Sequence, residues 1–175
     1  IVKLIICGGG LFYLIAAFYS FISIRLFFES GLFLTFVLLV VVWASDIGAY
    51  FAGKIVGGPK MAEAISPNKT WAGMIGACLW SAFCMVGFYL SAQFLSHYLN
   101  ISAELPVSNV FFAFLLGAMM APIGQLGDLL VSMAKRRTGD KDTGVVIPGH
   151  GGLLDRIDSL LLASMFFFIV LKSVG

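Results

Sequence analysis

Long apolar runs separated by short polar segments form the main pattern of this chain. The runs lack the alternation of barrel strands, and each has about the twenty residues that a helix needs to cross a membrane. The chain is therefore predicted to be all-α, a polytopic helical membrane protein with a single domain over residues 1–175. The predicted spans are Leu4 to Ile24, Leu32 to about Val56, Trp71 to about Leu95, Asn109 through Arg137, and Leu153 to Val174.

Composition supports a membrane protein. Apolar residues make up 60% of the chain and charged residues 11%, against about half and about a quarter in soluble domains. The three cysteines all lie inside apolar runs, without the spacing of a zinc site or a disulfide framework, so packing is their expected role.

Charged residues are concentrated between Ser132 and Asp158. Charges in a membrane are costly and are kept mainly where they pair, line a water-filled cavity or do chemistry, so this segment is the first candidate for function. Its charged and titratable residues are Lys135, Arg136, Arg137, Lys141, His150, Arg156, Asp140, Asp142, Asp155 and Asp158.

An isolated acid, Asp46, interrupts the second apolar run. At helical spacing, Ala49 and Gly53 share its face and leave room beside the carboxylate, which indicates that it faces protein or water. The alternative is an acid at headgroup level that pairs with Lys54.

The turn Ser66-Pro67-Asn68 precedes Lys69 at the mouth of the third span. It is either a binding segment that presents a lysine or a capping turn with an interfacial lysine.

The fourth span contains a second acid, Asp128. Pro122 and the glycines after it predict a kink or a locally unwound helix, and broken backbone is tolerated in a membrane only where it is buried or lines a cavity. Gln125, Asp128 and Ser132 fall on a common face of this helix. A functional role is therefore favoured for Asp128.

Two acids open the last span. Asp155 and Asp158 are three residues apart, which predicts that both carboxylates point the same way. The turn Pro148 to Gly152 leads into this helix, and the bare amides of a helix N-terminus bind anions such as phosphate.

The distribution of basic residues predicts the orientation. Basic residues follow the second and fourth spans, whereas the segment after the third span has none, so the site is expected on the cytoplasmic side. Clustered carboxylates are suited to Mg²⁺, and lysine and arginine to phosphates. The residues alone thus indicate metal-assisted phosphoryl or nucleotidyl transfer at a cytosol-facing, polar cleft.

The segment S-x-A-K-R-(x)4-K-D-x-G-(x)2-I-P-G-H-G-G-L-x-D-R-I-D, from Ser132 to Asp158, closely resembles the signature of phosphatidate cytidylyltransferases, also called CDP-diacylglycerol synthases. WASDIGAYFAGK, SPNKTWAG and GQLGDLLVS resemble further motifs of that family, in the same order. The resemblance implies the transfer of a cytidylyl group from CTP to phosphatidic acid, with release of pyrophosphate, in the bacterial inner membrane. It implies Mg²⁺ and a second, monovalent cation such as K⁺, and it indicates that this chain is the C-terminal, catalytic part of a longer family member.

The resemblance also implies roles for individual residues. The expected metal ligands are Asp128, Asp155, Asp158 and Asp46. The expected catalytic residues are Asp128, Asp155, Lys141 and Arg156. The expected substrate-binding residues are Ser66, Asn68, Lys69, Ser132, Lys135, Arg136, His150, Gly151 and Gly152.

Other functions and partners stay open at this stage. A cation-coupled transporter also uses broken spans with buried acids, and a kinase or a CTP-dependent enzyme for another lipid phosphate fits the same residue types. A purely structural membrane subunit would not need this density of charge. The expected partners are CTP, phosphatidic acid and membrane lipid, with no nucleic acid, and a homodimer is an alternative to a monomer.

Overall fold

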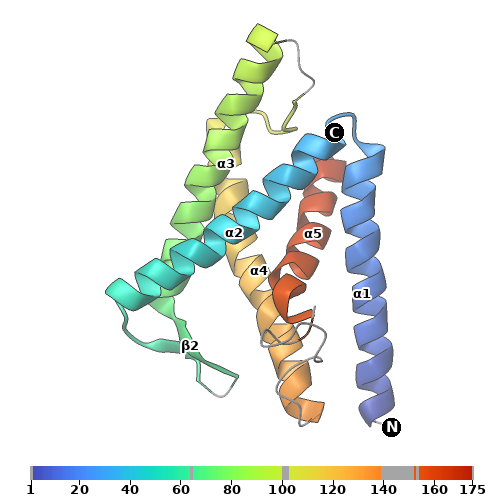
Figure 1. Cartoon of the computed structure of the whole chain (residues 1–175), viewed down its shortest axis with the longest axis vertical. Coiled ribbons are helices and arrows are strands. Elements are labelled where there is room, and N and C mark those ends of the chain that lie inside the picture. Colours follow the sequence, from blue (N-terminus) through green and yellow to red (C-terminus); the bar gives the residue numbers. More distant parts are fainter. Residues whose placement is uncertain (1, 64, 100–102, 139–151, 153, 175) are drawn as a thin grey trace.

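The fold is a bundle of long helices with one small hairpin (Figure 1). The computed structural model describes residues 2–63, 65–99, 103–138, 152 and 154–174. Within these residues there are five helices and two strands: α1 (Val2–Phe27), α2 (Gly31–Ile55), β1 (Lys60–Ala62), β2 (Ser66–Thr70), α3 (Trp71–Leu99), α4 (Val110–Thr138) and α5 (Leu154–Val174).

The five predicted spans are confirmed. Each described helix is long and apolar enough to cross a membrane, and the helix bounds differ from the predicted ones by a few residues at most. Large apolar side chains on the outer surface, such as Phe12, Trp43 and Phe83, are more than half exposed. This exposure suits a lipid environment, and the chain is an integral membrane protein.

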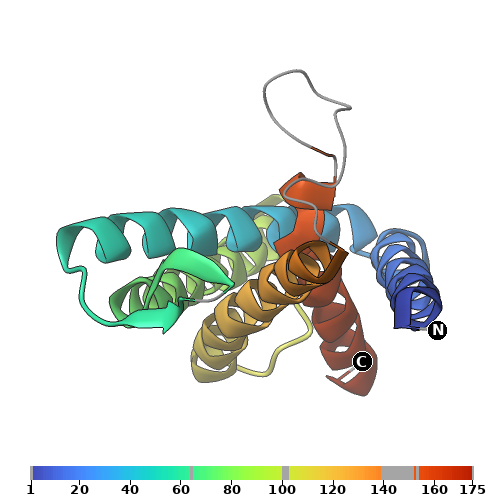
Figure 2. The same cartoon turned by 90° about the horizontal axis from the view of Figure 1, so that it is seen from below.

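Helix α2 runs obliquely across α3, α4 and α5 and contacts all three, while α1 flanks α5 (Figures 1 and 2). Apolar side chains from these helices form the core, which includes Ile24, Leu34, Leu38, Met85, Met120 and Phe167. The Ser164 hydroxyl on α5 donates a hydrogen bond of 3.3 Å to the carbonyl of Ala17 on α1.

Small residues let α2 and α3 approach closely. A Cβ atom on Gly48 would lie 2.6 Å from the carbonyl oxygen of Gly76, closer than real side chains come. Glycine at this crossing therefore brings the two backbones together, as small residues commonly do between membrane helices. The crossing lies two residues from Asp46 and so fixes the position of that acid.

A short antiparallel hairpin of β1 and β2 connects α2 to α3. Only a turn was expected here, so the pairing of these strands is an addition to the all-α prediction. At the end of β2, the Thr70 hydroxyl accepts a hydrogen bond of 3.1 Å from the Gly73 amide. This contact caps the N-terminus of α3, so the capping alternative is correct for Thr70.

Helix α4 continues without a break through Pro122. The prediction of local unwinding is therefore wrong. The Ser81 hydroxyl on α3 donates a hydrogen bond of 2.8 Å to the Gly117 carbonyl, in the turn before the proline. Neighbouring helices help membrane helices to tolerate a proline, and both α3 and α5 pack on α4.

Candidate active site

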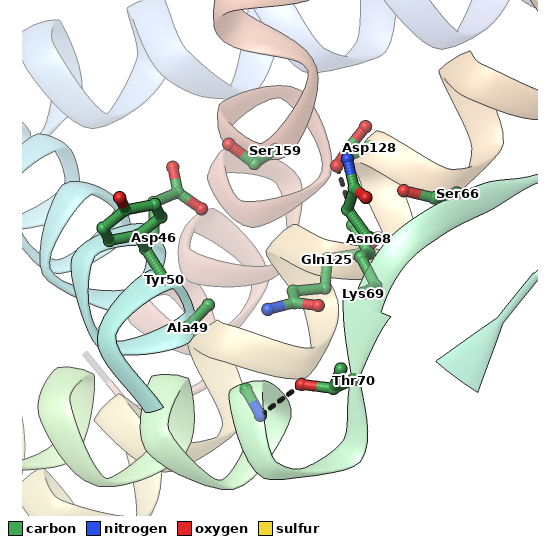
Figure 3. Close-up of a pocket in the computed structure, with 11 residues that line it drawn as sticks. Asp46, Ala49, Tyr50, Ser66, Asn68, Lys69, Thr70, Gln125, Asp128 and Ser159 are labelled. Atoms are coloured by element: carbon green, nitrogen blue, oxygen red, sulfur yellow. Dashed lines mark hydrogen bonds and ion pairs between the residues drawn. The ribbon is translucent and has the colours of Figure 1, made fainter. Parts of the chain in front are cut away.

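A cavity of about 280 Å³ lies where α2, β2, α4 and α5 meet (Figure 3). It lies toward the end of the bundle that carries the hairpin, the end of α4 and the chain's N-terminus (Figure 1). Much of the lining is polar, and each of these four elements contributes at least one side chain. The lining residues are Asp46, Ala49, Tyr50, Ser66, Asn68, Lys69, Thr70, Gly73, Gln125, Asp128 and Ser159.

An ion pair between Lys69 and Asp128 joins the hairpin to α4. The Lys69 ammonium lies 2.6 Å from Asp128 Oδ2 and donates a second hydrogen bond of 3.3 Å to the Gln125 carbonyl. The Ser132 hydroxyl, one turn further along α4, donates to Asp128 Oδ1 at 3.1 Å. The predicted common face of α4 is therefore confirmed, and Asp128 is held from two sides.

Asp46 enters the cavity from α2 and directs its carboxylate toward the space between α2 and α4 (Figure 3). Lys54, its alternative partner, instead donates a hydrogen bond of 3.3 Å to the Tyr50 hydroxyl and lies 5.5 Å from the centre of that ring. The interpretation of Asp46 as an acid paired with Lys54 is thus wrong, and the acid faces the polar cavity.

Asp158, from the first turns of α5, lies within hydrogen-bonding reach of Asp128. Its Oδ1 atom accepts a hydrogen bond of 2.7 Å from the Ser159 amide. Two carboxylates this close repel each other when both are charged, so the pair is stabilised by a positive charge between or beside them. In this structure the Lys69 ammonium supplies that charge.

Asp155 forms a separate ion pair. Its Oδ1 atom lies 2.5 Å from the Lys135 ammonium, and its Oδ2 atom accepts a hydrogen bond of 3.0 Å from the Gly152 amide. Asp155 and Asp158 therefore form their hydrogen bonds with different groups, and the expectation that both carboxylates point the same way stays a prediction. Asp155 reaches back to an amide before the first turn of α5, where a negative charge is favourable.

The structure brings together only part of the predicted site. Ser66, Asn68 and Lys69 line the cavity. Arg136 and Arg156 are exposed, at the end of α4 and the start of α5. Three predicted residues lie outside the described part of the chain, namely Lys141, His150 and Gly151.

The polar lining residues Tyr50 and Ser159, and Gly73, were missed at the level of sequence. Tyr50 lies one helical turn after Asp46, and Ser159 lies one turn after Asp155. Helical spacing from each acid was the available signal. It was not decisive, because the same spacing also points to lipid-facing positions.

The carboxylates at the site form a donor set of a kind that Mg²⁺ uses. In the residues that the structure describes, no group of three or more acid, histidine or cysteine side chains has the geometry to hold a metal ion. Mg²⁺ in nucleotide sites commonly takes one or two carboxylates and completes its shell with phosphate oxygens and water. The adjacent carboxylates of Asp128 and Asp158 fit that arrangement.

The family model and the relatives that match this chain all name cytidylyltransferases. A model of the cytidylyltransferase family matches residues 3–174. A phosphatidate cytidylyltransferase of Bacillus subtilis is 38% identical over 159 residues, covering 91% of this chain and 55% of the relative. The enzymes of the same name from Haemophilus influenzae and Brucella suis are 41% and 39% identical, covering 81% and 93% of this chain.

The chain spans about half the length of the curated relatives that it matches. It covers 48% of the Haemophilus influenzae protein and 55% of the Brucella suis protein. The cavity residues of all the contributing elements fall within residues 3–174, the part that the family model matches.

Proposed function

The chain belongs to the cytidylyltransferase family, and from that premise we propose that it carries the catalytic centre of a phosphatidate cytidylyltransferase. The reaction joins CTP to phosphatidic acid and gives CDP-diacylglycerol and pyrophosphate. The observation that supports this proposal most strongly is the Lys69–Asp128 pair in a cavity that Asp46 also lines, with Asp158 within hydrogen-bonding reach of Asp128.

The chemistry is an in-line displacement at phosphorus. A phosphate oxygen of phosphatidic acid attacks the α-phosphorus of CTP and forms a new P–O bond. The bond from the α-phosphorus to the oxygen that bridges to the β-phosphorus breaks, and pyrophosphate leaves with that electron pair. Positive charge near the phosphates lowers the barrier because negative charge builds up on their oxygens in the transition state.

Lys69 is the cation best placed for this task. Its ammonium lies at the cavity wall, and its side chain is 17% exposed, so a phosphate that enters the cavity can reach it. In this proposal the ammonium leaves Asp128 for a phosphate oxygen when substrate binds. Lys135 makes the corresponding exchange from Asp155, and the exposed Arg136 and Arg156 add positive charge near the entrance.

Asp128 and Asp158 would hold Mg²⁺, with Asp46 across the cavity and Asp155 reached once Lys135 has moved. When bound, Mg²⁺ would neutralise phosphate charge and orient the leaving group. A monovalent cation such as K⁺ would be a second, weaker occupant of the same acidic region. Lys141, His150 and Gly151 keep the phosphate-binding roles that the family resemblance implies for them.

The charge distribution supports a cytoplasmic active site. Lys54 lies in the last turn of α2, and Lys135, Arg136 and Arg137 lie in the last turn of α4, at the same end of the bundle as the hairpin (Figure 1). Single basic residues, Arg25 and Lys172, lie in the last turns of α1 and α5 at the other end. Positive residues favour the cytoplasmic side of the bacterial inner membrane. CTP is available on that side.

The transporter alternative loses its main support. It relied on a broken fourth span, and α4 is continuous through Pro122. The polar cavity also lies toward one end of the bundle (Figure 1), where it could receive the phosphate of a membrane lipid. An enzyme for another lipid phosphate would share every group described here, and only the product distinguishes it.

The test is pyrophosphate release from CTP by the purified protein in mixed micelles, with phosphatidic acid and Mg²⁺ each present or omitted. The proposal predicts release only when both are present, together with a CDP-lipid product. Nucleoside diphosphate in place of pyrophosphate would indicate a lipid kinase. A product formed with a polyprenyl phosphate but not with phosphatidic acid would move the substrate to another lipid class.

A further inference from the structure

Tyr13 on α1 has a buried hydroxyl group without a hydrogen-bond partner. Among the described residues, only its Oη atom and the Ser23 hydroxyl oxygen are buried side-chain polar atoms in this state. A buried polar group that forms no hydrogen bond loses its hydration without compensation, so such a group calls for a partner that arrives with a ligand, an ion or water. Phenylalanine would fill the same space without this cost.

The Tyr13 hydroxyl lies beside the carboxylate pair of the candidate active site. A Cβ atom on Gly127 would lie 3.5 Å from Tyr13 Oη and 2.7 Å from the Asp158 carbonyl oxygen. Gly127 directly precedes Asp128, and Tyr13 is close enough to Asp158 for an electrostatic interaction. The hydroxyl therefore lies where α1, α4 and α5 meet.

Glycine at position 127 makes this arrangement possible. Any side chain there would collide with the α5 backbone at Asp158 and would also fill the space next to the tyrosine hydroxyl. The close approach of α4 and α5 thus brings Asp128 and Asp158 together and leaves the phenol next to them. Ser23, the other such hydroxyl, lies ten residues further along α1.

We propose that Tyr13 is a positioning residue for the Asp128–Asp158 pair. Its hydroxyl donates a hydrogen bond to the Asp158 carboxylate, directly or through one water molecule, when the pair holds a divalent cation. Carboxylates that bind metal are commonly fixed by such hydrogen bonds, which set their orientation. Helix α1 would thereby take part in a site whose cavity is lined by residues of other elements.

This inference rests on the proposed function, but it is tested without the reaction. The purified chain in detergent is titrated with Mn²⁺, in the absence of CTP and lipid, and the free ion is followed by electron paramagnetic resonance. Tyr13→Phe removes only the hydroxyl, and we expect it to weaken Mn²⁺ binding by about tenfold, the lower end of the range for such partners. Without the ion, the unfolding midpoint of this variant is expected to be equal to or above that of the original chain.

Tyr19→Phe is the matched control, because Tyr19 is on the same helix, is 60% exposed and packs edge-on against Phe168. It is expected to leave Mn²⁺ affinity unchanged. In an Asp158→Asn background, Tyr13→Phe is expected to have no further effect, because the acceptor carboxylate is gone.

Equal Mn²⁺ affinity in the original chain and in Tyr13→Phe would overturn the inference, and so would an original chain that binds no Mn²⁺. A tenfold loss that persists in the Asp158→Asn background would also overturn it, since the hydroxyl would then act on another group. A chain that binds Mn²⁺ in the expected Tyr13-dependent manner but makes no CDP-lipid would contradict the proposed function alone.

Discussion

In the proposed function, Lys69 and a metal ion would occupy neighbouring positions beside Asp128 in turn. Its ammonium lies 2.6 Å from Asp128, where a metal ion would also bind, and it faces a cavity that a phosphate can enter. The lysine neutralises the acid in this structure, and under the proposed function it would be released when Mg²⁺ and CTP bind together. Loss of this lysine is therefore expected to strengthen the binding of a metal ion alone and to weaken the binding of the nucleotide.

Substitution of Lys69 by methionine tests both effects. Without CTP, Lys69→Met is expected to tighten Mn²⁺ binding by about fivefold, because a partly exposed ion pair that competes with the metal contributes about 1 kcal/mol. The same change is expected to lower kcat/KM for CTP by about 100-fold, because a cation that stabilises the phosphates is lost.

Lys54→Met is the control for Lys69→Met, since Lys54 contacts Tyr50 and lies in the last turn of α2. It should change neither quantity. Weaker Mn²⁺ binding in Lys69→Met would show that the ammonium supports the metal site and does not compete with it.

Asp155 differs from the other acids because its partner is Lys135. Asp155→Asn keeps an oxygen that can accept the Gly152 hydrogen bond but removes the charge that binds Lys135. Turnover is expected to fall by about 100-fold, while the protein stays folded in detergent. Product formation and the unfolding midpoint are the two measurements, and unchanged turnover would remove Asp155 from the active site.

At the residue level, the acids could be identified from the sequence but their partners could not. A charge inside an apolar run marks Asp46 and Asp128 directly. The pairing of Lys69 with Asp128, and of Lys135 with Asp155, depends on how α4, α5 and the hairpin are rotated and placed. Periodicity along one helix carries no such information.

At the level of elements, hydropathy predicted the five spans and their bounds well, because the length of a membrane helix is set by the thickness of the bilayer. Two local features were not predicted correctly. The hairpin of β1 and β2 is too short and too polar for a strand pattern, and α4 continues through Pro122 while packing against α3 and α5.

The junction of β2 and α3 gives a prediction at this level. Thr70→Ala removes the hydroxyl that caps α3 and is expected to cost about 1 kcal/mol of stability. Because Lys69 is the preceding residue, the KM for CTP is also expected to rise. Thr70→Ser keeps the capping oxygen and should restore both the unfolding midpoint and KM; a serine variant as impaired as alanine would mean that the methyl group of Thr70, which is buried, is what matters.

At the level of the whole molecule, the arrangement gathers polar groups toward one end of an apolar bundle. The hairpin, the ends of α2 and α4 and the start of α5 lie together at that end, and the C-terminus lies at the other (Figure 1). An active site near this end of the bundle can receive a lipid phosphate from the membrane and a nucleotide from water. The proposed cytoplasmic orientation of this end rests on the basic last turns of α2 and α4.

The orientation is tested by cysteine labelling in spheroplasts. In a background without Cys7, Cys78 and Cys84, the exposed positions Glu63 and Ser108 are replaced one at a time. A membrane-impermeant maleimide is expected to label Ser108→Cys from outside and Glu63→Cys only after permeabilisation. The reverse pattern would place the cavity outside the cell, where CTP is not available.

The most direct test of the central claim is the formation of CDP-lipid from labelled CTP and phosphatidic acid by the original chain, Asp128→Asn and Glu104→Gln. Glu104 is exposed and follows α3, remote in sequence from every cavity residue. If the cavity is the site of cytidylyl transfer, the original chain and Glu104→Gln form CDP-lipid. Asp128→Asn then forms it at a rate lower by at least about 100-fold. Equal product from a folded Asp128→Asn variant would contradict this assignment.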